Sequence, residues 1–263
     1  MSLVQIRDLY AGYSGKPVID GISLDLREGE ITGILGTNGC GKTTFLKAVC
    51  GVLDHRGTCT VEGTKLEGLP AKKLGKVCAY LPQRSGISID IPVLDAVLMG
   101  FNPVLGLLEY PTPEMKQKAR RALEQAGLCG MEDINYQTLS EGQKQLCMLA
   151  RLMVSEGRFY LMDEPESALD FWNRGMLFDL LDRKIGKEKC AALITLHDPG
   201  LALNRCGRLI LLDKGKISAE LYPGKDSDDT MAQALTQIYG PVSIHRCRDR
   251  KGRERLVMLG EDE

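Results

Sequence analysis

The chain has 263 residues, which is enough for one large α/β domain with a buried core. Its 34 Lys and Arg residues nearly balance its 35 Asp and Glu residues, and this balance disfavours nucleic acid or anionic lipid as a partner. Nine cysteines without a CxxC pair favour the reduced thiols of a cytoplasmic protein over a disulfide framework or a zinc site. No stretch reaches the roughly 18 apolar residues of a membrane span. The N-terminus shows no signal segment, so a role at a membrane would require another chain.

The first predicted elements are two half-buried strands. Residues 3–9 and 22–26 alternate apolar and polar side chains, which is typical of antiparallel strands. Residues 11–15, between them, are expected to form a loop that carries Tyr13. The ring of Tyr13 either anchors a hairpin or forms a platform for a purine base.

The next segment has the composition of a phosphate-binding loop between a buried strand, residues 30–35, and a helix at residues 45–50. Its glycines permit the backbone angles that turn successive N–H groups inward at the N-terminus of a helix. Lys42 would reach the β- and γ-phosphates of a nucleotide, and the Thr43 hydroxyl would bind magnesium. A glycine-rich turn that binds nothing is the alternative, and the strand, the helix and the Lys-Thr pair all oppose it. The predicted loop consists of Gly36, Thr37, Asn38, Gly39, Cys40, Gly41, Lys42, Thr43 and Thr44.

The middle of the chain reads as a helical lobe inserted into the α/β core. Before it, residues 58–61 and 76–81 predict two strands, and the second ends at Pro82 and Gln83. Within it, helical periodicity replaces the strand pattern, and prolines mark the joints. The predicted helices of the lobe cover residues 92–101, 113–126 and 141–155.

The core resumes with an apolar strand at residues 158–164, which ends in two carboxylates, Asp163 and Glu164. A helix to about residue 185 and a strand at 191–196, followed by His197, complete the alternation that is typical of a parallel sheet with helices on both faces. Ligands of such sheets bind at the carboxyl ends of the strands, where Gly36, Gln83, Asp163 and His197 would meet.

The tail, from residue 222 onward, predicts a helix at residues 229–239 and short strands at 242–246 and 254–259. We therefore expect an α/β fold with a mainly parallel sheet, an N-terminal antiparallel β subdomain and an inserted α-helical subdomain at about 85–155. A short β extension at 241–263 would follow.

Residues 139–143, Leu-Ser-Glu-Gly-Gln, open the last helix of the lobe, where a hydroxyl and free N–H groups suit a phosphate. With this segment the chain resembles the nucleotide-binding ATPase subunit of an ABC transporter, over about residues 3–259. The quoted motifs follow one another in that family's order. The resemblance implies a P-loop NTPase core at residues 1–240, with ATP and Mg²⁺ as cofactors.

The resemblance also implies a role for each site residue. Tyr13 stacks on adenine, Asp163 is linked to magnesium, and Gln83 touches magnesium and faces the membrane partner. Glu164 is the catalytic base, and His197 contacts the γ-phosphate and keeps Glu164 in place. The signature at 139–143 and the dimer-crossing loop at 167–170 complete the nucleotide site, with Ser140, Gly142, Gln143 and Asp170 as binding residues.

In the family the signature completes the nucleotide site of the opposite subunit, so a head-to-tail homodimer with two ATP molecules is implied. Integral membrane permease subunits are the implied partners, a substrate-binding protein is an indirect one, and no nucleic acid is expected. The expected location is the cytoplasmic face of the cell membrane, as a peripheral subunit. The expected activity is ATP hydrolysis coupled to transport.

Two residues depart from expectation. The family has glycine at the third signature position, whereas this chain has Glu141. Its negative charge near the partner's ATP should weaken dimerisation unless the side chain points outward. Cys40 lies beside a helix N-terminus, where a thiolate is favoured, so a maleimide should inactivate the enzyme and ATP should protect it.

Residues 79–83, 93–100 and 235–240 are similar to importers of ferric siderophores, haem or cobalamin. A soluble ABC ATPase such as the one that serves iron–sulfur cluster assembly is the rival, and genes for a permease and a binding protein nearby would separate the two. A degenerate module without turnover is disfavoured because Lys42, Glu164 and His197 are all present.

Overall fold

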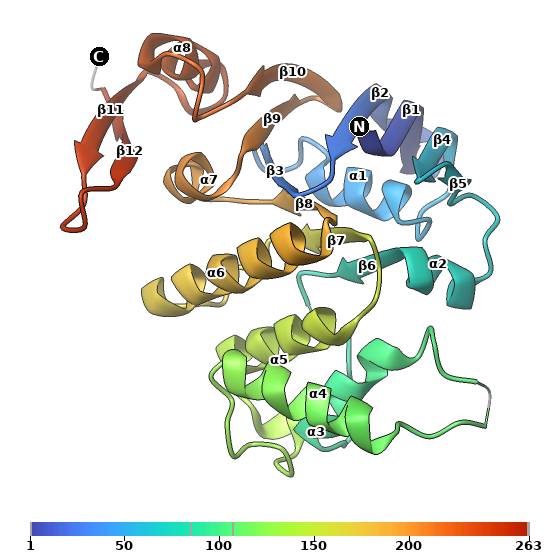
Figure 1. Ribbon diagram of the computed structural model, residues 1–263. Coiled ribbons are helices and arrows are strands. Elements are labelled where there is room, and N and C mark those ends of the chain that lie inside the picture. The colour runs from blue at the N-terminus through green and yellow to red at the C-terminus, as the bar shows by residue number, and fades with distance from the viewer. Residues whose placement is uncertain (1, 85, 107, 262–263) are drawn as a thin grey trace.

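The computed structural model describes residues 2–84, 86–106 and 108–261, and its centre is a six-stranded sheet of order β10-β9-β3-β8-β7-β6 (Figure 1). The strands from β9 to β6 are parallel, and β10 pairs antiparallel with β9. The central strands are nearly continuous apolar runs, as expected for strands that are buried on both faces of a sheet. The strands are β3 (Glu30–Leu35), β6 (Cys78–Leu81), β7 (Phe159–Asp163), β8 (Ala191–Thr195), β9 (Arg208–Asp213) and β10 (Lys216–Leu221).

One face of this sheet packs on helix α1 (Lys42–Val49) and on a second, antiparallel sheet of order β2-β1-β4-β5. Its strands are β1 (Ser2–Tyr13), β2 (Lys16–Arg27), β4 (His55–Val61) and β5 (Thr64–Lys65). The predicted antiparallel pair is confirmed, but the loop expected at 11–15 is wrong. β1 continues to Tyr13, which pairs with Lys16, so the turn is confined to Ser14 and Gly15.

The opposite face is covered by helices α5 (Glu141–Val154), α6 (Phe171–Glu188) and α7 (Pro199–Arg205) (Figure 1). Alternate residues of β7 divide between the two cores: Phe159 and Leu161 pack toward α1, whereas Tyr160 and Met162 pack toward these helices. The sheet therefore lies between two apolar layers, as the α/β prediction requires, although β-structure accompanies the helix on one face.

The predicted helical lobe is confirmed. It contains α3 (Val93–Leu98), the 3₁₀ turn η1 (Met99–Phe101), α4 (Pro113–Gln125), the 3₁₀ turn η2 (Tyr136–Thr138) and α5. α4 begins where Thr112 caps the backbone N–H of Met115 and Pro113 stands at the first helical position. Helix α2 (Ala71–Val77) precedes β6, so residues 76 and 77, expected in the strand, are helical.

The chain ends in α8 (Asp228–Tyr239) and a hairpin of β11 (Val242–Arg248) and β12 (Glu254–Gly260), in agreement with the predicted tail. Helix α7 and strands β9 and β10 were not predicted from the sequence. The predicted limits at residues 85 and 263 lie outside the described residues. Within the described ranges, no helix is both long and apolar enough to cross a lipid bilayer.

Candidate functional site

The candidate site is a pocket of about 250 Å³ at the carboxyl end of the central sheet. The loop between β3 and α1 forms its floor, and residues after β6, β7 and β8 form its walls. Of the four residues predicted to meet at this edge, Gln83 and His197 line the pocket. Gly36 and Asp163 instead bond to residues that line it. The lining residues are Val18, Asn38, Gly39, Gly41, Lys42, Thr43, Thr44, Gln83, Glu164 and His197.

The loop needs two of its glycines for different physical reasons. Gly41 has φ 112°, a backbone conformation that side-chain-bearing residues rarely adopt, and α1 begins directly after it. Gly36 has no positive φ; a Cβ there would lie 2.3 Å from the carbonyl oxygen of Leu212 in β9. The expectation that Gly36 supplies a special backbone angle is therefore wrong, because close packing requires it.

Lys42 is buried and reaches back across the loop. Its Nζ donates to the carbonyl oxygens of Gly36 at 2.8 Å and Thr37 at 3.3 Å. These bonds hold a buried ammonium group above the N-terminus of α1, where the helix dipole also favours an anion. The position suits contact with the phosphates of a nucleotide, as the sequence predicts.

Cys40 contradicts the expectation of a reactive thiolate. The side chain is only 5% exposed, and a Cβ on Gly36 would lie 2.6 Å from its Sγ, so the thiol packs beneath the loop. Burial raises the pKa of Cys40 and outweighs the opposing effect of the Lys42 charge. Desolvation therefore decides the state of this thiol, not the nearby helix N-terminus.

Asp163, at the end of β7, forms the centre of a hydrogen-bonded group. Its Oδ1 accepts from the hydroxyl of Thr43 at 3.1 Å and from the hydroxyl of Thr195 at 2.7 Å. Thr195 ends β8, is fully buried, and accepts the backbone N–H of Glu164 at 2.9 Å. Sequence reasoning missed Thr195. The one feature of the sequence that could have indicated its role is that it is a polar residue within an apolar strand.

Glu164 is held from both sides. His197 Nε2 lies 2.6 Å from its Oε1, and the side-chain amide of Gln83 donates to its Oε2 at 2.5 Å. The residue has φ 49°, a strained backbone conformation for a non-glycine residue. This contact agrees with the predicted partnership of Glu164 with His197, whose catalytic role stays a prediction.

Glu166 is a second residue that the sequence analysis did not single out. It is 2% exposed, and its Oε1 accepts the backbone N–H of His197 at 3.1 Å. Its Oε2 is buried without a hydrogen-bond partner among the described residues. Burial raises the pKa of this carboxyl group. Glu166 thus positions the backbone of His197, and nothing in the sequence marked it as buried.

Other predicted binding residues lie outside the pocket. Tyr13 is half-exposed at the end of the β1–β2 hairpin. Ser140 caps α5, where its side chain and that of Gln143 each bond the other's backbone N–H. Asp170 caps α6 through the N–H of Asn173. The nucleotide contacts of these residues and of Gly142 stay predictions.

The signature segment and the loop before α6 nevertheless lie together. A Cβ on Gly142 would lie 3.1 Å from the carbonyl oxygen of Ala168. The side chain of Glu141, the departure from the family signature, is 78% exposed in the single chain and pairs with Lys144 at 2.9 Å. The effect of Glu141 on dimerisation stays a prediction.

Comparison with known proteins places this site in a family. Residues 19–167 match the family described as ABC transporter. A hemin import ATP-binding protein of Vibrio cholerae is 33% identical over 254 residues, which cover 94% of this chain and 95% of the relative. A Helicobacter pylori protein described as an iron chelatin transport ATP-binding protein is 32% identical, with coverage of 82% and 85%.

A solved structure supports the same assignment. An ABC transporter described as of the metal-chelate type, in an inward-facing conformation, superimposes with a TM-score of 0.80 at 25% identity over 98% of both chains. Fold, pocket and sequence similarity agree. The chain therefore belongs to the ABC transporter family, in which it is an ATP-binding and ATP-hydrolysing subunit.

Proposed function

We propose that two copies of this chain close head-to-tail over two ATP molecules, and that ATP hydrolysis drives import of a metal chelate through a partner permease. The observation that carries the proposal is the meeting of Lys42, Glu164 and His197 at one pocket. Hydrolysis requires a base to deprotonate water and positive charge on the equatorial oxygens of the γ-phosphate. These side chains supply both.

Each group has one task in the proposed reaction. Glu164 orients and deprotonates the attacking water, and His197, 2.6 Å from its Oε1, keeps the carboxylate in place and reaches toward the γ-phosphate. Lys42 gives up its carbonyl partners in the loop to bind the phosphates. The loop N–H groups add further positive charge.

Mg²⁺ fits the oxygen atoms beside this pocket. The Thr43 hydroxyl and the Asp163 carboxylate lie 3.1 Å apart, and Gln83 adds a side-chain carbonyl. Hard oxygen donors and nucleotide phosphates are the ligands that Mg²⁺ prefers. Bound there, the ion would neutralise charge on the β- and γ-phosphates.

The head-to-tail arrangement follows from where the signature lies. Ser140 and Gly142 line no part of the pocket of their own chain, and Ser140 sits at a helix N-terminus that suits an anion. A second copy, related by a two-fold axis, would bring its Ser140 to this chain's ATP, and the reciprocal contact would follow by symmetry.

A permease partner fits the cleft between β6 and the helical lobe. This cleft has a volume of about 200 Å³, is lined by Tyr80, Met99 and Pro103 among others, and lies beside the strand that leads to Gln83. A cytoplasmic segment of the permease seated there would sense the state of the site through Gln83. The subunit would then be peripheral on the cytoplasmic face, with a substrate-binding protein acting indirectly.

The substrate class rests on similarity. The relatives compared above carry names that refer to hemin and iron chelatin, and the solved transporter is described as of the metal-chelate type. An iron siderophore, haem or cobalamin is therefore the proposed cargo. Uptake of labelled ferric siderophore, hemin or cobalamin by cells that carry or lack this chain would identify it.

The test of the proposed enzyme uses Glu164→Gln, with Glu124→Gln on the exposed face of α4 as the matched control. With Mg²⁺ and ATP, we expect Glu164→Gln to release phosphate about 10²–10⁴ times more slowly and to accumulate as a dimer in sedimentation. The control should behave as wild type. Unchanged turnover in Glu164→Gln, or a monomer at saturating ATP, contradicts the proposal.

A further inference from the structure

A second concave surface lies away from the nucleotide pocket. This groove, here named the α6–β12 groove, has a volume of about 890 Å³ and runs between α6, α7 and β12. None of its lining residues lines the nucleotide pocket. Its apolar wall consists of Phe171, Trp172 and Met176 from α6, Leu201 from α7, and Val257 and Met258 from β12.

Two aromatic rings at the mouth of the groove are exposed to solvent. Phe171 and Trp172 are each 82% exposed, and their rings touch edge to face with centroids 5.7 Å apart. Val257 and Leu259 on β12 are also exposed. Aromatic side chains gathered on a surface mark a contact site, and Trp and Phe are enriched in protein interfaces.

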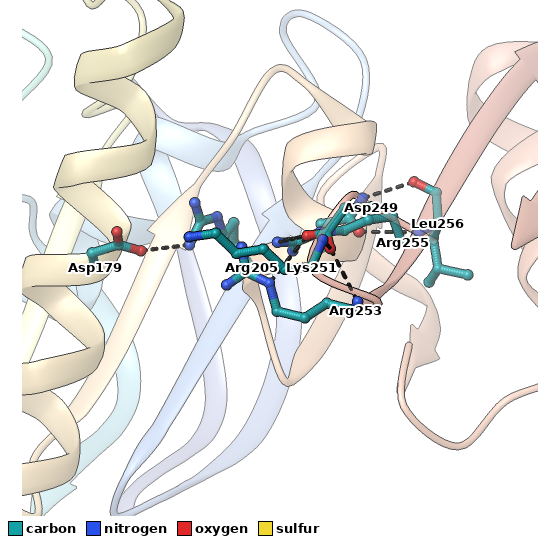
Figure 2. A network of polar contacts seen from close by, with 8 residues as sticks. Asp179, Arg205, Asp249, Lys251, Arg253, Arg255 and Leu256 are labelled. Atoms are coloured by element: carbon teal, nitrogen blue, oxygen red, sulfur yellow. Dashed lines mark hydrogen bonds and ion pairs between the residues drawn. The ribbon is translucent and has the colours of Figure 1, made fainter. Parts of the chain in front are cut away.

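Polar contacts fix the walls of the groove relative to one another. Arg205 of α7 bonds Asp179 of α6 at 2.7 Å. The Asn204 side chain bonds the backbone of Leu256 twice, donating at 2.7 Å and accepting at 3.0 Å. Figure 2 shows the network that continues to Asp249, which holds the hairpin turn through Arg253 and Arg255. The groove is therefore preformed.

The occupant is indicated by the position of the groove. Phe171 directly follows Asp170 of the dimer-crossing loop, and α7 begins two residues after His197. Both helices that line the groove thus start at segments that the proposed function places at the interface between two copies. The groove continues that interface along the surface of the chain.

The surface around the groove carries charges of both signs. Arg174 and Asp198 form an ion pair of 3.8 Å there, and Arg205 and Asp179 form another of 2.7 Å. Arg183 and Arg255 also line the groove. In a two-fold contact the same patch meets itself, so a patch that carries both signs can pair with its copy.

We propose that the α6–β12 groove is a second contact between two copies of this chain, one that holds the dimer without nucleotide and extends the ATP-dependent interface. The inference rests on the proposed head-to-tail dimer. Each ring would bury about 150–250 Å². Four rings together then supply roughly half of the ~1,600 Å² of a standard interface. The nucleotide-free dimer should therefore be weak, and ATP should tighten it.

The experiment uses Trp172, the single tryptophan of the chain, as its own reporter. In nucleotide-free protein, we expect its emission to move to shorter wavelength and its quenching by acrylamide to fall as the protein concentration rises. Sedimentation should show dimers over the same range. Phe171→Ala keeps the reporter and should raise the dissociation constant of this dimer about tenfold or more.

The matched control is Tyr110→Ala, which removes an aromatic ring that is 89% exposed on the helical lobe. It should leave the dissociation constant unchanged. Val257→Ser changes the opposite wall of the groove and should weaken the dimer as Phe171→Ala does. Equal affinities for wild type, Phe171→Ala and Val257→Ser overturn the inference.

Measurement of Glu164→Gln with Mg²⁺ and ATP separates this inference from the proposed function. If that variant dimerises while Trp172 stays as accessible to acrylamide as in the monomer, the groove contact is wrong and the proposed function stands. If Trp172 is shielded in a nucleotide-free dimer that ATP does not tighten, the proposed ATP-dependent closure fails instead. Shielding of Trp172 in a chain that remains monomeric also overturns the inference, since the occupant is then another molecule.

Discussion

Replacing Thr195 by valine tests the site through one buried hydroxyl group. The change keeps the branched shape of the side chain but removes the donor that bonds Asp163 Oδ1 at 2.7 Å. It also removes the acceptor for the backbone N–H of Glu164, which retains the carbonyl oxygen of Thr195 at 3.2 Å. The main loss is therefore the bond to the carboxylate.

The size of the effect follows from that bond. A buried hydrogen bond to a charged group is worth about 1.5–3 kcal/mol, so we expect the free energy of unfolding to fall by about 2–3 kcal/mol. Asp163 also loses the group that orients it toward Thr43. The proposed function assigns Asp163 to magnesium, and loss of an outer partner of a metal ligand typically costs 10–100-fold in activity. We therefore expect kcat for ATP hydrolysis to fall by about that factor.

The assays are urea unfolding followed by circular dichroism, and phosphate release at saturating ATP. Thr32→Val is the matched control because Thr32 is also fully buried in the central sheet, yet its hydroxyl has no hydrogen-bond partner within the described part of the chain. That change should be neutral or slightly stabilising. Thr195→Ser should retain most of the activity. The reasoning is refuted if Thr195→Val and Thr32→Val shift stability equally and both retain full turnover.

Three further predictions concern single side chains. Maleimide should label the exposed Cys247 quickly and Cys40 slowly even without ATP, because burial raises the pKa of Cys40. Peptide mass spectrometry would measure the labelling of each cysteine. Rapid modification of Cys40 would contradict its buried position. Burial raises the pKa of Glu166. The folded state is therefore most stable at low pH, where this carboxyl group is protonated, and loses stability as the pH rises through the raised pKa. At pH 8 the free energy of unfolding of Glu166→Gln should therefore be about 1 kcal/mol higher than that of wild type. This difference should shrink as the pH falls toward about 4, the ordinary pKa of a carboxyl group. Equal pH dependence of stability in the two proteins would contradict this. Because Glu141 is exposed and pairs with Lys144, Glu141→Gly should change the affinity of the ATP-dependent dimer by no more than about threefold. A tenfold higher affinity of the variant would contradict this and would show that Glu141 repels the partner's ATP.

Local patterns predicted the parts of the site that lie within one segment. The loop around Lys42, the pair Asp163 and Glu164, and the capped start of α5 at Ser140 each carry their signal in neighbouring residues. The helices of the lobe were also predictable, since 3.6-residue periodicity and proline positions mark them locally. Strand β9 was within reach as well, because residues 208–213 form an apolar run of the same kind as β7.

The sequence by itself predicted which residues would bind phosphate and determined which face a core, because those properties depend on residue type and short spacing. Tertiary structure alone decided why Gly36 must lack a side chain and why the pKa of Cys40 is raised. It also decided that the Thr195 hydroxyl links the Asp163 carboxylate to the backbone N–H of Glu164. Each of these depends on segments far apart in the chain that meet at one edge of the sheet. Desolvation and close contact arise only there, and no pattern of neighbours records them.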